Sequence, residues 1–129
     1  MAFGMFPLFS VFVGGGIGAT LRYLTGMAAL RLIGPGYPYG TLAANLIGGL
    51  AMGMLAGVLA RAAHGGEHWR LFIGVGILGG YTTFSSFSLE VMLMLQRGEW
   101  LTGFGYIALS VVGAITALGA GLAVVRVLA

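Results

Sequence analysis

The chain has 129 residues, of which 59% are hydrophobic and 7% are charged. A soluble domain of this size carries roughly a quarter charged residues, so this chain lacks the polar side chains that would cover a water-facing surface. Its formal charge of +3 comes from six arginines and three glutamates, and the arginines stand singly along the chain. Nucleic-acid binding requires clustered positive charge. The composition therefore excludes a soluble domain and a nucleic-acid partner, and it indicates an integral membrane protein.

Four apolar segments are each long enough to cross a bilayer, which requires about 20 residues of helix. They are expected at residues 6–30, 39–60, 69–96 and 100–125, separated by short polar or glycine-rich turns. The N-terminus lacks the charged region and cleavage site of a signal peptide. No cysteine is present, which excludes disulfides and thiolate metal sites. We expect one all-α domain over residues 1–129, located in the cell (inner) membrane as a multi-pass protein.

Glycine recurs at intervals of four on the first two spans. The positions are Gly14 and Gly18 on the first span and Gly49, Gly53 and Gly57 on the second. Such small-residue ridges let helix backbones approach closely in lipid, so we expect tight helix pairs. Two glycine runs, at 14–19 and 74–79, match a dinucleotide fingerprint, but neither follows a strand or opens a solvated helix. A bound nucleotide is therefore rejected.

The third span contains a polar run at its centre, residues 79–88. This run holds two adjacent glycines and five serine or threonine residues. Non-helical backbone at membrane mid-depth is tolerated only where protein buries it or where it lines a wet cavity. We therefore expect the third helix to be broken at mid-membrane, at the centre of an ion pathway.

The polar residues inside the spans are expected in one half of the membrane. We name the face that carries the N-terminus side one and the opposite face side two. The residues placed on the side-two half are Arg22, Thr41, Asn45, Glu90, Tyr106 and Ser110. One copy of the chain would supply only half of a polar pathway, and a second copy inserted upside down would supply the rest.

The arginines are compatible with insertion in both directions. Three are expected on each side: Arg61, Arg70 and Arg126 on side one, and Arg22, Arg31 and Arg97 on side two. Orientation in a membrane follows the excess of positive residues on one face, and here there is none. We therefore predict an antiparallel, dual-topology homodimer.

The expected lining of the pathway suits a small anion. Its hydrogen-bond donors are the hydroxyls of Thr41, Thr83, Ser110 and Tyr106 and the amide of Asn45. Phe84 and Phe87, spaced i and i+3, would share one helix face and offer electropositive ring edges. Conduction requires binding that is weak enough to release the ion, and this lining contains no fixed cation that would trap it.

Glu90 is the one acid expected inside a span. As a proton relay it would mark a coupled transporter, but we interpret it as structural, either reaching the interface or paired with Arg22. His64 and His68 are spaced as metal ligands can be, but we assign them to a solvated loop. No nucleophile–base–acid set indicates an enzyme. Two alternatives to a channel stay open: a small proton-coupled multidrug exporter, and a non-conducting packing subunit.

The chain resembles the Fluc (CrcB-type) fluoride ion channel family along its whole length. The resemblance lies in residues 15–23 (GGIGATLRY), 40–48 (GTLAANLIG) and, above all, 79–90 (GGYTTFSSFSLE). It implies passive fluoride export through an antiparallel homodimer with two pores. It also implies a structural sodium ion at the dimer centre, held by backbone carbonyls of the broken third helix.

The resemblance also implies roles for particular residues. Phe84 and Phe87 resemble the pore phenylalanines and Asn45 the pore asparagine. Gly79 and Thr82 resemble the sodium-binding carbonyl positions. The remaining matches are Thr41, Tyr106 and Ser110 as polar groups of the pathway and Arg22 as the vestibule arginine. Where the family often has a second hydroxyl one turn after Ser110, this chain has Ala114, which bears on how far the polar track extends along the fourth span.

Overall fold

The computed structural model describes residues 4–128, so the ends of the predicted domain, residues 1–3 and 129, lie outside the described part. The described chain is entirely helical apart from its connections. The elements are α1 (Met5–Leu32), α2 (Tyr39–Arg61), α3 (Gly66–Trp69), η1 (Arg70–Leu78), α4 (Gly79–Tyr81), α5 (Ser85–Gln96) and α6 (Trp100–Leu128). Four stretches are long and apolar enough to cross a membrane: α1, α2, Gly66–Gln96 and α6. The four predicted spans are confirmed, with each boundary within three residues of its expected position.

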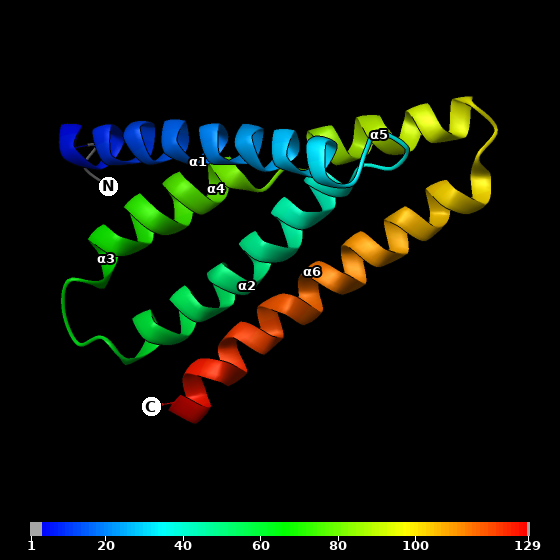
Figure 1. Cartoon of the computed structure of the whole chain (residues 1–129). Helices are drawn as coiled ribbons and strands as arrows, with labels where there is room; N and C mark the ends of the chain where they lie inside the picture. The colour runs from blue at the N-terminus through cyan, green and yellow to red at the C-terminus, as the bar shows by residue number, and fades with distance from the viewer. Residues whose placement is uncertain (1–3, 129) are drawn as a thin grey trace.

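The helices pack as two pairs that meet at α2. α1 packs along η1 and α4, and α2 packs along α6. In Figure 1, α1 runs along the upper edge, and α2 and α6 cross beneath it on a diagonal. α5 leaves this bundle at the break and extends to the far end, where a turn joins it to α6.

The glycine ridges form both helix pairs. A Cβ on Gly14 would lie 2.6 Å from the Phe72 carbonyl oxygen, so α1 touches the backbone of η1 directly. A Cβ on Gly49 would lie 2.9 Å from the Ala114 carbonyl oxygen, so α2 meets α6 in the same way. The expected close packing is confirmed, because no larger side chain fits at these positions without separating the helices.

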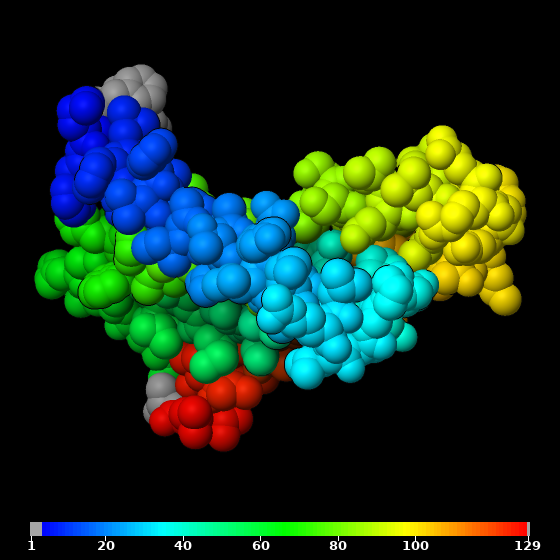
Figure 2. Space-filling view, turned by 45° about the horizontal axis from the view of Figure 1, so that its top comes forward, coloured from blue at the N-terminus to red at the C-terminus, as the bar shows by residue number. Residues whose placement is uncertain are grey.

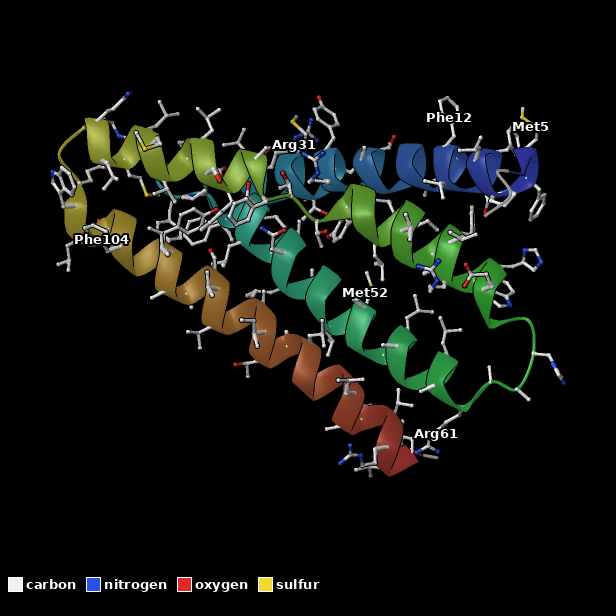
Figure 3. The ribbon with its side chains drawn as sticks, turned by 180° about the vertical axis from the view of Figure 1, so that it is seen from behind. Met5, Phe12, Arg31, Met52, Arg61 and Phe104 are labelled. Carbon is white, nitrogen blue, oxygen red and sulfur yellow. The ribbon has the colours of Figure 1, made fainter. Side chains whose placement is uncertain are left out.

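Large apolar side chains cover the outside of the bundle. Phe12 on α1 is 80% exposed, and Phe12 and Phe104 both point away from the other helices in Figure 3. Such a surface would be unstable in water, but it suits contact with lipid tails. The exposed apolar exterior therefore agrees with the membrane location that the composition predicts.

The third span is broken as predicted, and it contains a further irregularity that the sequence did not indicate. Residues Arg70–Leu78 form a π-helix, in which the Gly79 N–H bonds to the Gly74 carbonyl five residues earlier. π-helical turns are rare and concentrate at functional sites. The helix then stops at Thr82, whose ψ of 158° is extended, and resumes at Ser85. The break therefore occupies residues 82–84.

Candidate functional site

Asn45 on α2 holds the break by pairing with the backbone of Thr83. The Thr83 N–H donates to Asn45 Oδ1 at 2.8 Å, and Asn45 Nδ2 donates to the Thr83 carbonyl oxygen at 3.0 Å. An amide side chain carries a donor and an acceptor side by side, as a peptide group does. Asn45 therefore satisfies both backbone groups of a residue that lies outside any helix.

The backbone carbonyls at the end of α4 differ in their hydrogen-bond partners. The Leu78 carbonyl accepts hydrogen bonds from the N–H and the hydroxyl of Thr82, at 3.0 and 2.9 Å. The Gly80 carbonyl accepts one from Arg22 Nε at 3.2 Å. Within residues 4–128, no hydrogen bond reaches the carbonyl oxygens of Gly79 and Thr82. These two are the carbonyls that the sequence resemblance assigned to a cation.

The start of α5 leaves backbone N–H groups free. The Ser86 N–H donates to Thr83 Oγ1 at 3.2 Å, whereas the N–H groups of Ser85 and Phe87 have no acceptor in the described residues. The first N–H groups of a helix carry a partial positive charge that favours anions. The break thus presents carbonyl oxygens from one half-helix and N–H donors from the other.

A pocket of about 520 Å³ opens at the break. Its polar lining includes Asn45, Thr83 and Ser110, and its aromatic lining is Phe84 and Phe87. Ser110 is only 6% exposed, and among the described residues its Oγ is the one buried side-chain polar atom without a hydrogen-bond partner. A buried hydroxyl without a partner costs free energy, so this atom is available to a ligand. Ala114, Gly79 and Thr82 also line the pocket.

The two phenylalanines lie together but in different surroundings. Their ring centroids are 5.6 Å apart, although Phe84 lies in the break, one residue before α5 begins. Phe87 is 7% exposed and packs on Tyr106 with centroids 5.2 Å apart, whereas Phe84 is 77% exposed at the mouth of the pocket. The sequence does not reveal which of the two rings is buried, because both are apolar residues expected on the same helix face.

Tyr37 is a residue at this site that the sequence did not indicate. Its ring packs on Tyr106 at 5.5 Å and on Tyr39 at 5.0 Å. Together with the phenylalanine pair, these rings form an aromatic column from the break to the loop between α1 and α2. Tyr37 lies in a connecting turn, where no helical periodicity marks its direction. The only sequence signal was the cluster of tyrosines around the turn.

The expected pairing of Glu90 with Arg22 is wrong. Glu90 instead accepts hydrogen bonds from Thr41 Oγ1 at 2.9 Å and from the Tyr106 hydroxyl at 3.0 Å. Arg22 lies on α1 beside the end of α4, while Glu90 lies past the break on α5, which contacts α2 and α6. The break therefore separates the two charges. Glu90 and Thr41 line a second pocket, of about 240 Å³, beneath the loop that carries Tyr37.

Most of the predicted pathway residues thus meet along one continuous polar and aromatic line. Ser110, Asn45 and Thr83 lie at the pocket of the break, and Thr41 and Tyr106 lie on the line towards side two through Glu90. Arg22 does not line this pocket and instead contacts the Gly80 carbonyl at the end of α4. Residues 4–128 contain no cluster of three or more His, Cys, Asp or Glu side chains that would bind a metal.

Comparison with known proteins gives the family. Residues 9–122 match the family described as CrcB-like protein, Camphor Resistance (CrcB). The chain is 53% identical over 122 residues to a protein of Sphingopyxis alaskensis and 54% identical over 123 residues to one of Phenylobacterium zucineum; each alignment covers 95% of this chain and 97% of the relative. Both relatives are named fluoride-specific ion channel FluC. The chain belongs to the CrcB-like family.

Proposed function

We propose that this chain is a fluoride-specific ion channel of the cell inner membrane, as its relatives are named, and that it conducts fluoride passively and catalyses no reaction. The single observation that carries the proposal is the pocket at the break. There, Ser110, whose hydroxyl has no partner, lines one space together with Phe84 and Phe87, which lie at the start of α5, where backbone N–H groups have no acceptor in the described residues. The hydroxyl and the N–H groups can donate to an anion, and the edge of a phenylalanine ring is electropositive.

The affinity expected from these groups suits an ion that passes through the pocket rather than one that stays bound. Fluoride must lose hydration water to enter a pocket lined largely by apolar atoms, and each donor replaces part of that water. No arginine lines the pocket, so no fixed full charge would hold the ion there. Binding strong enough to admit an ion and weak enough to release it is the condition for flux.

A second copy in the inverted orientation would complete the pathway. The polar groups of one copy end at the break, where Phe84 is 77% exposed beside an open pocket. Figure 2 shows a notch between α1 and the arm made by α5 and the start of α6. An exposed polar break is unfavourable in lipid, so a partner surface is required. The equal division of arginines permits the inverted partner, which would give two pores per dimer.

A sodium ion at the dimer centre fits the residues present. The Gly79 and Thr82 carbonyl oxygens have no donor within residues 4–128, and oxygen atoms are the ligands that hard cations prefer. Two carbonyls are too few for such an ion, but the same pair from an inverted copy would double them. When bound, the ion would compensate the carbonyl dipoles and join the two chains.

Flux measurements test the channel. Liposomes loaded with fluoride and containing the purified protein are expected to release it at channel rates, as followed with a fluoride electrode. Phe84→Ile and Asn45→Asp are expected to slow that release severely. Unchanged release in both variants would refute the pocket as the pathway.

The alternative of a proton-coupled exporter has one observation in its favour, because Glu90 lines a pocket of its own. Its carboxylate, however, already accepts two hydrogen bonds from Thr41 and Tyr106. If Glu90→Gln abolished pH-driven uptake of a lipophilic cation, the exporter would replace the channel. Purification in a stable complex with other chains, together with an absence of flux alone, would favour a packing subunit.

Antiparallel assembly has a separate test. Single cysteines placed in the loop between α1 and α2, for example at Gly36, are expected to react with a membrane-impermeant reagent from both sides of the membrane. Reaction from one side only would exclude the inverted partner and leave the fluoride pathway to be tested by flux alone.

A further inference from the structure

We infer that Asn45 is a positioning residue that creates both ion sites at once, by withdrawing Thr83 from the helix. The inference rests on the proposed function, since it concerns how the two proposed sites come to exist. Asn45 would then be more than a hydrogen-bond donor in the pore, because its bonds to Thr83 also leave the Gly79 carbonyl, on the other side of the break, without a donor.

The hydrogen bonds of a continuous helix identify what Asn45 replaces. In an α-helix each N–H donates to the carbonyl four residues earlier. Thr83 would therefore donate to the Gly79 carbonyl and accept from the Phe87 N–H. In the structure both backbone groups of Thr83 bond to Asn45 instead, at 2.8 and 3.0 Å. Asn45 thus takes the place of two helical partners, Gly79 and Phe87.

The two displaced partners lie at the two proposed sites. The Gly79 carbonyl, which lost its donor, is one of the two oxygens assigned to sodium. The Phe87 N–H, which lost its acceptor, belongs to the free N-terminal end of α5, and Phe87 lines the same pocket as the unpartnered Ser110 hydroxyl. One side chain therefore frees an oxygen for a cation and an N–H for an anion.

The other contacts at the break do not have this effect. Arg22 binds the Gly80 carbonyl, and the Thr82 hydroxyl binds the Leu78 carbonyl, so both act on the first half-helix alone. The Thr83 hydroxyl accepts from the Ser86 N–H and acts on the second half alone. Among the described residues, Asn45 is the side chain that hydrogen-bonds to the backbone of Thr83, whose N–H and carbonyl would otherwise connect the two half-helices.

Two substitutions separate the donor of Asn45 from its acceptor. Aspartate retains an acceptor for the Thr83 N–H but cannot donate to the Thr83 carbonyl, and it adds negative charge at the pocket. Leucine retains neither, so the Thr83 N–H can return to the Gly79 carbonyl. Asn45→Asp is therefore expected to keep the sodium site and lose fluoride flux, whereas Asn45→Leu is expected to lose both.

The measurement is the sodium concentration that half-maximally raises the thermal unfolding temperature of the purified protein, with N-methylglucamine replacing sodium at constant ionic strength. Asn45→Leu is expected to raise this midpoint by about tenfold or more, because a ligand to a charged ion is lost. Asn45→Asp and the control Ser110→Ala are expected to keep the wild-type midpoint, although both reduce fluoride efflux. A merely structural role would lower the unfolding temperature without sodium and leave the midpoint unchanged.

The outcomes separate this inference from the proposals on which it rests. If sodium does not stabilise the wild-type protein, the central sodium site is wrong, and the inference falls with it. If sodium stabilises the wild type and Asn45→Leu keeps the same midpoint, the inference alone is overturned. Should Asn45→Leu fail to fold, Asn45→Ala takes its place, because it removes the same two hydrogen bonds to Thr83 with a smaller side chain. A raised midpoint then supports the inference, and a wild-type midpoint refutes it.

Discussion

The two halves of the third span are packed by different means. The first half, η1 and α4, lies against α1 through glycines, so that the Cα of Gly76 sits beside the Cα of Gly14. The second half, α5, lies against α6 through large side chains, with Phe87, Val91 and Met94 buried on Tyr106. Backbone contact fixes the first half, and interlocking side chains fix the second. The position of the break is therefore fixed by the half-helices on either side of it, although the backbone of residues 82–84 is irregular.

The difference also separates the two proposed ion sites. The first half belongs to a glycine-packed pair and ends in carbonyl oxygens without donors, whereas the second half begins with N–H groups beside side chains that line a pocket. A half-helix pair of this kind offers its negative end to a cation and its positive end to an anion, as broken helices in transporters do. Variants can therefore be expected to affect one half without the other.

The largest effect is expected from crowding the first half. Gly18→Ala places a Cβ onto the Ile77 carbonyl, so α1 and η1 must separate. Overpacking of a close contact costs roughly 1–3 kcal/mol, and occasionally more. The matched control is Gly16→Ala on the same helix, where an added Cβ has nothing within 4 Å. Thermal unfolding in detergent is expected to show a large loss for Gly18→Ala and little change for Gly16→Ala; equal losses would contradict glycine packing.

The next effect concerns the start of the second half. Phe84→Ile is expected to slow fluoride efflux at least about tenfold, corresponding to roughly 1.4 kcal/mol of barrier, with little loss of stability, because Phe84 is exposed. Phe87→Ile is expected to lower both efflux and the unfolding temperature, because Phe87 is buried against Tyr106. If the two variants behaved alike in both assays, the assignment of different roles to the two rings would be wrong.

A smaller effect is expected one turn further along α5. Glu90→Gln replaces one of the two carboxylate oxygens by an NH2 group, so either Thr41 or Tyr106 must turn its hydroxyl from donor to acceptor, and the charge-assisted bonds become neutral ones, at a cost of roughly 1 kcal/mol. Tyr106→Phe and Glu90→Gln both alter the same Tyr106–Glu90 hydrogen bond, so the double variant is expected to be more stable than the sum of the single losses predicts. Thermal unfolding of the four proteins gives this coupling, and strict additivity would show that the bonds are not formed.

The smallest effect is expected at the turn after α5. There the Arg97 guanidinium donates to the Glu99 carboxylate at 3.1 Å and lowers the pKa of Glu99 below its ordinary value of 4.5. A lowered pKa stabilises the folded protein above the unfolded pKa, and this stabilisation is lost as the pH falls through the folded pKa. Because the pair is exposed, Glu99→Gln is expected to change the unfolding temperature only slightly at pH 7, and the change is expected to shrink as the pH falls through the folded pKa of Glu99. A marked change at pH 7 would show that this turn is part of a buried contact.

The sequence predicted the fold closely because each span leaves a direct signal. Apolar length located the four helices, glycine at every fourth residue located the helix pairs, and serine and threonine beside Gly79 and Gly80 located the break. These signals are local: each depends on residues within a few turns of one another.

The contacts within the site were less predictable because they join different helices. Hydropathy does not reveal that α4 ends beside Arg22 and that Glu90 lies beyond the break. The π-helix was missed for a related reason. An i+5 turn changes the direction of side chains by a small angle per residue, and a glycine-rich segment such as 74–80 has few side chains to show it.

The aromatic column limits the insertions that the loop between α1 and α2 can tolerate. Connecting loops are usually the places where proteins accept insertions. Tyr37, however, sits in such a loop and touches the ring of Tyr106, which in turn touches Phe87. Any added residue between α1 and α2 would move the outer ring and leave the inner ones without support. We therefore expect the length of this turn to be as constrained during evolution as the residues of the break itself.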